Sequence, residues 1–320
     1  MSMRRRPIKL THQKIWSCLT AAVVAVAVTA CSLVGVAYDN LEWYVLRETD
    51  GLVALTEPQK ETLRVDFRRA QARHRAEQLP MVIAYLDGLA DAAEYGLTRP
   101  QAECAVDWAR GLYRETAALA VPASARLLAS LSQSQQIQLS EALAERGAEY
   151  REEYLDPDAV RRVQVRAERA TEFIEYLTAD LEPPQRLSIE AWSDATPDTA
   201  EAWLNYRTAE QAALLSMLAQ GASEAELEDR LRRWWVDRAD IPPSLLAQVQ
   251  VLEQSVVDLS LSLYRTLSSG QRQHAQRRLR NLADDLRALL PKSDGAVQGV
   301  MQPPSSVPAL VDCGLTRPDL

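Results

Sequence analysis

Cysteine and histidine side chains carry much of the metal, redox and acid–base chemistry of proteins, and this sequence contains few of them. They are Cys18, Cys31, Cys104, Cys313, His12, His74 and His274. No two histidines lie three or four residues apart, and no Cys-x-x-Cys pair occurs. Structural and catalytic metals need several such ligands brought together, so the sequence predicts no metal site, no cofactor and no redox motif.

Signatures of catalysis are also sparse. The sequence contains no nucleophile elbow, no glycine-rich phosphate loop and no His-Glu-x-x-His helix. Carboxylates occur as adjacent pairs such as Glu152-Glu153 and Asp284-Asp285. Adjacent helix positions point to different faces, so these pairs do not converge on a substrate. We therefore expect a protein that is not an enzyme, and an enzyme acting on cell-wall or lipid material is the less favoured alternative.

Two short stretches are candidates for binding. His74 stands next to Arg75, where it could respond to pH or contact a ligand, or could simply bond a neighbouring carboxylate. Trp234 and Trp235 form a doublet with arginines on both sides. The doublet could line a groove for a client protein or an envelope polymer. The alternative is that one tryptophan lies in the core and shields the other.

Helices must position these groups. The chain has only 11 glycines among 320 residues, and the helix-forming residues Ala, Leu, Arg, Glu and Gln dominate. Stretches with the period-2 pattern of strands are missing after the first forty residues. The sequence predicts an all-α fold, an elongated multi-helix bundle of antiparallel hairpins without a sheet.

A repeated pattern, Leu-Thr/Ser-x-x-Gln, indicates where the helices begin. In a capping box the hydroxyl accepts from a backbone N–H in the first turn, and the Gln side chain reaches back to the N–H of the capping residue. The predicted boxes pair Thr56 with Gln59, Thr98 with Gln101, Ser132 with Gln135, and Ser268 with Gln271. Glu182 and Gln185 form a weaker copy, and Ser223 with Glu226 forms a box without the leucine. We expect these residues to serve the backbone before any ligand.

These starts divide the chain. We expect a signal segment over residues 1–30, a lipidated lead-in with a short helix over 31–55, one helical domain over 56–291, and a disordered tail rich in Pro, Ser and Gly over 292–320. Within the domain, a long helix is expected from Glu57 to about Tyr95, bent at Pro80. A turn is expected at Pro122, after a helix over about 99–119.

The N-terminus has the three parts of an export signal. A basic stretch without acids is followed by an apolar segment over 15–30 and by small residues before a cysteine. Val28, Thr29, Ala30 and Cys31 resemble the lipobox of bacterial lipoprotein signals. The resemblance implies cleavage between Ala30 and Cys31 and attachment of a diacylglyceryl group to Cys31, which anchors the chain to a membrane.

In such lipoproteins, an aspartate directly after the cysteine favours retention in the inner membrane. This chain has Ser32 at that position. The resemblance therefore implies the periplasmic face of the outer membrane of a Gram-negative cell. The alternative is an uncleaved anchor, because the mostly apolar stretch over 15–38 is long enough to span a bilayer.

Export would leave Cys104 and Cys313 in an oxidising compartment. They could pair as a disulfide that holds the C-terminus to the body, or Cys104 could be buried in a helix with Cys313 free. The chain has 44 acidic and 36 basic residues, and the segment before Cys31 contains basic residues but no acidic ones. The exported part is thus acidic, and we expect no nucleic-acid partner.

The Leu-Thr-x-x-Gln pattern resembles that of the Spy-like periplasmic stress proteins, which are all-helical and include chaperones. A broader resemblance, over nearly all of the chain after the signal, is to an uncharacterised family of bacterial lipoproteins. It is carried by "CSLVGVAYDNLEW", "LTEPQ", "HRAEQLP", "EYREEYLDP" and "ADDLRALL". These resemblances imply a helical fold and the envelope, without an assigned activity.

The combined expectation is a non-catalytic envelope lipoprotein that binds periplasmic proteins or envelope polymers, in the manner of a chaperone or otherwise. A structural or assembly role within an envelope complex is the alternative.

Overall fold

The structure is a computed structural model that describes residues 33–290 and residue 313. These residues form helices and contain no strand, which confirms the expected all-α class. None of their helices combines the length and the apolar character needed to cross a membrane. The predicted signal segment lies outside the described residues, as does the predicted tail apart from Cys313.

The chain is helical almost from end to end of the described range, with two π-helical segments, η2 and η3, inserted between α-helices. In chain order the elements are α2 (Leu33–Asp39), α3 (Leu41–Val53), α4 (Glu57–Arg73), η2 (His74–Gln78), α5 (Leu79–Tyr95), α6 (Arg99–Ala129), α7 (Gln133–Tyr154), α8 (Ala159–Thr178), α9 (Pro183–Ala195), α10 (Ala200–Ala219), α11 (Glu224–Leu231), η3 (Arg232–Asp237), α12 (Pro243–Thr266) and α13 (Ser269–Arg287).

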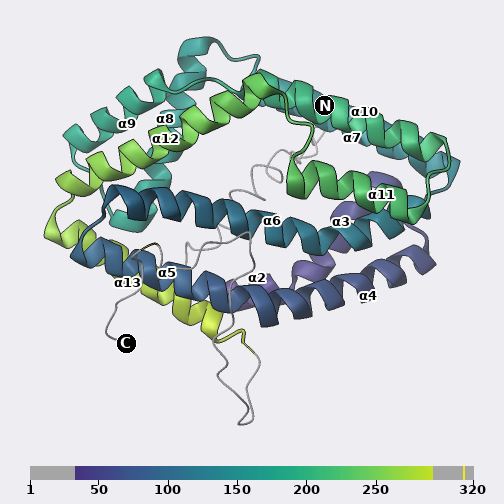
Figure 1. Cartoon of the computed structure of the whole chain (residues 1–320), viewed down its shortest axis with the longest axis horizontal. Coiled ribbons are helices and arrows are strands. Elements are labelled where there is room, and N and C mark those ends of the chain that lie inside the picture. Colours follow the sequence, from purple (N-terminus) through teal and green to yellow (C-terminus); the bar gives the residue numbers. More distant parts are fainter. Residues whose placement is uncertain (1–32, 291–312, 314–320) are drawn as a thin grey trace, which may run out of the picture.

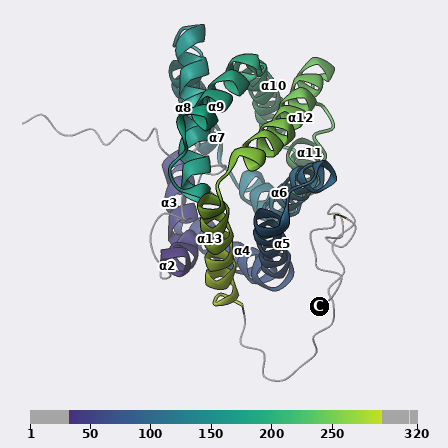
Figure 2. The same cartoon turned by 90° about the vertical axis from the view of Figure 1, so that its left-hand side faces the viewer.

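The helices build an elongated, flattened body. Figure 1 shows α3, α4, α7, α10 and α11 toward one end of the long axis, and α8, α9, α12 and α13 toward the other. α6 runs between the two ends. Seen edge-on in Figure 2, the helices form two layers, with α2, α3, α7 and α8 on one side and α6, α11 and α12 on the other.

The segment around Pro80 continues the helical path of α4 into α5 through η2. Proline has no N–H to donate to the preceding turn, so one hydrogen bond of a regular α-helix is missing at this point. The chain instead widens by one residue per turn, and the N–H of Leu79 donates to the carbonyl of His74. The predicted bend at Pro80 is therefore a π-helical turn, and it contains the candidate residues His74 and Arg75.

The prediction of a turn at Pro122 is wrong. α6 is one helix of 31 residues that contains Pro122. The neighbours Val121 and Ala125 are completely buried in the core. Burial of this face compensates for the hydrogen bond that the proline cannot make, so tertiary packing overrides the local preference of proline.

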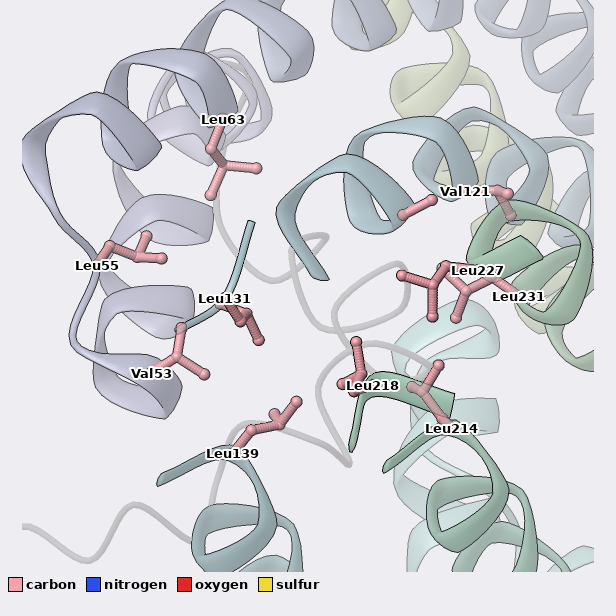
Figure 3. Close-up of a cluster of buried hydrophobic side chains, with 11 residues drawn as sticks. Val53, Leu55, Leu63, Val121, Leu131, Leu139, Leu214, Leu218, Leu227 and Leu231 are labelled. Carbon is pink, nitrogen blue, oxygen red and sulfur yellow. The ribbon is translucent and has the colours of Figure 1, made fainter. Parts of the chain in front are cut away.

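The largest apolar cluster lies where α3, α4, α6, α7, α10 and α11 meet. In Figure 3, side chains from these separate segments point toward one another. Its buried members are Val53, Leu55, Leu63, Val121, Ala125, Leu131, Leu139, Leu214, Leu218, Leu227 and Leu231. Leu55 and Leu131 are the leucines of two Leu-Thr/Ser-x-x-Gln copies, so these motifs contribute to the core as well as to helix starts.

α5 and α13 join the two ends of the body. Arg280 of α13 bridges Asp87 and Asp91 of α5, with N–O distances of 2.6 Å to each. Beneath these ion pairs the two helices share an apolar contact. Its buried residues are Ile83, Leu86, Ala90, Leu279 and Ala283.

Candidate functional site

The helix starts contain the hydrogen bonds of capping boxes. The side chains of Thr56, Thr98, Ser132 and Ser268 each accept from the backbone N–H three residues on, and Gln59, Gln101, Gln135 and Gln271 each accept from the N–H of the capping residue. Ser223 and Glu226 form the same arrangement at α11. At the start of α9, the Gln185 side chain accepts from the Glu182 N–H at 2.8 Å.

Two of these starts meet each other across the fold. The amides of Gln59 and Gln135 form a reciprocal pair, with N–O distances of 3.1 and 2.8 Å. Gln59 also donates to the carbonyl of Ser130, just after α6, at 3.1 Å. Gln135 donates to the carbonyl of Val53, at the end of α3, at 3.2 Å. α3 and α4 form one pair of consecutive helices, and α6 and α7 form the other. Each glutamine thus caps the start of its own helix and donates to a carbonyl at the end of a helix in the other pair.

The same arrangement occurs a second time. Gln185 and Gln271 form a reciprocal amide pair, with N–O distances of 3.1 and 3.0 Å. Gln185 donates to the carbonyl of Thr266, at the end of α12, and Gln271 donates to that of Asp180, just after α8. We call each set of two helix starts joined by a glutamine pair a glutamine crossing. By these contacts α3, α4, α6 and α7 correspond to α8, α9, α12 and α13.

The first glutamine crossing borders a polar hollow. It is lined by Ala54, Thr56, Gln59, Ser130, Ser132, Ser134, Gln135 and Gln138. Its polar groups are largely engaged with each other, since Gln59 and Gln135 satisfy their amides within the crossing. The crossing therefore holds helices together, and the predicted capping residues have structural partners.

His74 lies in η2 beside Tyr38 of α2. The Tyr38 hydroxyl is 3.0 Å from His74 Nδ1 and donates to the carbonyl of Gln71 at 3.4 Å. The Arg75 guanidinium lies over the Tyr38 ring, 5.1 Å from its centroid. Burial, with the charge of Arg75 as a second cause, lowers the pKa of His74. The alternative that His74 bonds a neighbouring carboxylate is not what the structure shows, because its described hydrogen bond is to tyrosine.

We predict that His74 makes stability pH-dependent. Its lowered pKa means that the folded protein binds fewer protons than the unfolded chain, whose histidine titrates near 6.5. The stabilisation is therefore present above that pH and is lost as the pH falls below it. Urea unfolding at pH 7.5 and 5.5 should show a smaller pH-dependent loss in His74→Gln than in the wild type. An equal loss in both proteins would contradict the prediction.

Trp234 and Trp235 lie in η3. Their rings are 6.0 Å apart and tilted by 51°, and both are partly buried against the largest apolar cluster. The wider π-helical turn lets adjacent residues pack against the same core, which a regular helix does not. The doublet is thus part of the packing, and the predicted arrangement of one core tryptophan and one shielding neighbour is replaced by two half-buried rings.

An arginine just after η3 forms a different surface. Arg238 has a left-handed backbone, with φ 51° and ψ 39°, which an arginine adopts only at a conformational cost. Its guanidinium carbon lies 5.0 Å from the Tyr113 ring of α6 and 5.6 Å from the Trp203 ring of α10. Within the described part of the chain, Arg238 forms no ion pair. We call Arg238, Tyr113 and Trp203 the arginine–aromatic surface.

Buried polar groups lie next to this surface. Tyr206 packs against Trp203 with ring centroids 5.9 Å apart, and burial raises its pKa to about 12. Its hydroxyl is buried and has no hydrogen-bond partner among the described residues. Glu210 is buried as well, 2.8 Å from Arg230, yet desolvation raises its pKa. Perturbed titratable groups beside a strained residue are typical of functional sites.

The sequence indicates Trp234 and Trp235 as candidates, but it gives no sign of Tyr113, Trp203 or Tyr206. The helices that carry these residues are far apart in the chain, and no local pattern links them. The positive φ of Arg238 does have a local cause, because this residue directly follows the π-helical turn η3. Cys31 and Ala30 lie outside the described residues, so lipidation and cleavage there stay predictions.

Cys104 of α6 is joined to Cys313 by a disulfide whose Cα atoms are 5.7 Å apart. Cys313 is buried with Met81, Ala92 and Trp108. The disulfide thus holds Cys313 against α6. Among the described residues, no group of three or more His, Cys, Asp or Glu side chains could hold a metal ion.

Comparison with known proteins adds one finding. Residues 51–241 match the model of DUF6279, a family of unknown function. The chain belongs to this family. No curated protein and no solved structure matches the chain.

The part matched to DUF6279 contains the whole first glutamine crossing and the arginine–aromatic surface. It ends before α12, so Gln271 and the helices α12 and α13 of the second crossing lie beyond it.

Proposed function

We propose that the protein is a non-catalytic binding protein of the bacterial envelope, anchored through a lipid on Cys31 to the periplasmic face of the outer membrane. Its arginine–aromatic surface would bind an anionic group of a periplasmic protein or an envelope polymer. The resemblance of residues 28–31 to a lipobox supports the anchor, and the disulfide agrees with an oxidising compartment.

The observation that carries the binding role is the position of Arg238. Its charge is held over two rings, and no carboxylate of the described chain pairs with it. A guanidinium has five N–H donors in a planar fork that matches a carboxylate or a phosphate. Tyr113 is exposed, so the surface is open to a ligand.

Arg238→Gln should weaken binding to peptidoglycan sacculi, whose stem peptides carry free carboxylates. A charge-assisted contact contributes about 1.5–3 kcal/mol, so we expect the apparent affinity for sacculi, measured by co-sedimentation over a series of sacculus concentrations, to fall about tenfold or more. Arg161→Gln is the control, because Arg161 is an exposed arginine of α8 that pairs with Glu168 at 2.9 Å.

Equal sedimentation of all three proteins would contradict recognition of this polymer through Arg238. Crosslinking in intact membranes then separates the remaining versions of the function. A stoichiometric partner captured by the wild type and lost in Arg238→Gln would place the surface in an envelope complex, as the structural or assembly role requires.

A chaperone-like version of the function rests on exposed apolar side chains. Val160 of α8 is 67% exposed and Leu187 of α9 is 63% exposed. Such residues could contact an unfolded client. Suppression of aggregation of a reduced, unfolded client protein would support this version, and no effect at stoichiometric excess would refute it.

A further inference from the structure

α2 and α3 present one outward stripe that is exposed in the described part of the chain. Val36 and Trp43 are 54% and 58% exposed, and they lie seven residues apart. Asn40 between the two helices keeps a helical conformation, with φ −92° and ψ 0°. Seven residues are close to two helical turns, so both side chains lie on the same side. Tyr38, half a turn away from Val36, is buried.

A cation completes the stripe. The guanidinium carbon of Arg47, one turn beyond Trp43, lies 5.1 Å from the centroid of its ring. Arg47 is exposed and forms no ion pair with a described residue. We call Val36, Asn40, Trp43 and Arg47 the α2–α3 stripe. Its order along the helix is apolar, amide, aromatic and cationic.

Neighbouring acids do not give the stripe a net negative charge. Asp39 lies 3.7 Å from Arg75. Glu42 accepts from Arg68 at 2.7 and 3.1 Å, and Arg64 lies 3.3 Å from it. Both acids are thus paired, whereas Arg47 forms no ion pair with a described residue.

The stripe also stands close to the residue that would carry the lipid. α2 begins at Leu33, two residues after Cys31. At about 3.3–3.6 Å per residue, the chain from Cys31 to Val36 spans at most about 18 Å. Trp43 follows about 10 Å further along the helix axis. An acylated Cys31 would therefore hold the stripe within reach of the bilayer surface.

We propose that the α2–α3 stripe lies on the phospholipid surface beside the anchor, with Trp43 in the headgroup layer and Arg47 against lipid phosphates. Tryptophan prefers this layer because its ring is amphipathic, and arginine reaches phosphates with its long stem in the apolar boundary. An exposed helix stripe beside a lipid anchor would add to membrane binding through the apolar area that it buries and through the attraction of its cation to anionic lipids. This inference rests on the proposed lipid anchor.

The test uses the full-length protein purified from membranes and reconstituted into vesicles of phosphatidylcholine and phosphatidylglycerol with brominated acyl chains. Bromine quenches tryptophan fluorescence at short range. The wild type should show a quenched component that Trp43→Phe lacks. Trp192→Phe is the matched control and should keep that component, because Trp192 lies in α9 and donates to Ser255 at 3.0 Å.

Equal quenching of the wild type and Trp43→Phe would overturn the stripe as a lipid contact. Trp43 shielded from aqueous iodide but not reached by bromine would overturn it too, since a protein would then cover the stripe. The intact mass of the same samples reports on Cys31 separately. An unmodified Cys31 defeats the proposed anchor, whereas a lipidated Cys31 with unquenched Trp43 defeats only this inference.

Discussion

Cys104→Ser should lower the free energy of unfolding by about 2–5 kcal/mol, the usual loss when a native disulfide is removed. The bond joins residues 209 positions apart, so it restricts the unfolded chain over most of its length. Cys104 packs against the apolar cluster that contains Met81 and Trp108, so the serine hydroxyl at position 104 would be left in an apolar contact.

Urea unfolding of the wild type with and without a reductant, and of Cys104→Ser and Cys313→Ser, checks this result. The two variants should unfold at similar urea concentrations, and reductant should move only the wild type. A wild type that is insensitive to reductant while its thiols are shown to be released would contradict a stabilising disulfide.

Gln185→Leu should destabilise the protein by about 2–4 kcal/mol, although leucine and glutamine are similar in size. Gln185 is only 2% exposed. Its loss removes the side-chain donor to the carbonyl of Thr266 and both bonds between the two amides, although Gln271 keeps its bond to the carbonyl of Asp180. Each buried polar group that loses its hydrogen bond costs about 1–3 kcal/mol.

A double-mutant cycle tests this result. Gln271→Leu should be similarly harmful, and the double variant should lose less than the two single losses combined, since neither change then strands the other amide. Gln273→Leu, at an exposed position on the same helix, is the control. Single variants with the wild-type unfolding midpoint would show that the crossing contributes no stability.

The helix starts could be predicted from the sequence because a capping box depends on four consecutive residues. Thr56 and Gln59 supply both halves of the motif, and α4 begins at Glu57. The pairing of Gln59 with Gln135 could not be predicted, because it joins residues 76 positions apart and no feature of either motif identifies its partner.

The structure differs from the sequence prediction at Pro122 and at the tryptophan doublet for the same reason, which is packing against the core. Pro122 is a helix breaker by local preference, and only the burial of Val121 and Ala125 explains why α6 continues. Trp234 and Trp235 cannot both face inward in a regular helix, and the π-helical turn that allows it is a response to the core. The arginine–aromatic surface depends on the same turn and was missed for that reason.

The contact between α5 and α13 determines which apolar surface stays exposed while the chain is being synthesised. The apolar residues Ile83, Leu86 and Ala90 are made early, whereas the helix that covers them begins only at Ser269. The first glutamine crossing can close once residue 135 exists, yet this face of α5 stays open until nearly the whole domain has been synthesised. Open apolar faces of this kind promote aggregation. A chain that stops before α13 would thus be prone to aggregation, because the apolar face of α5 is covered only when α13 has been completed.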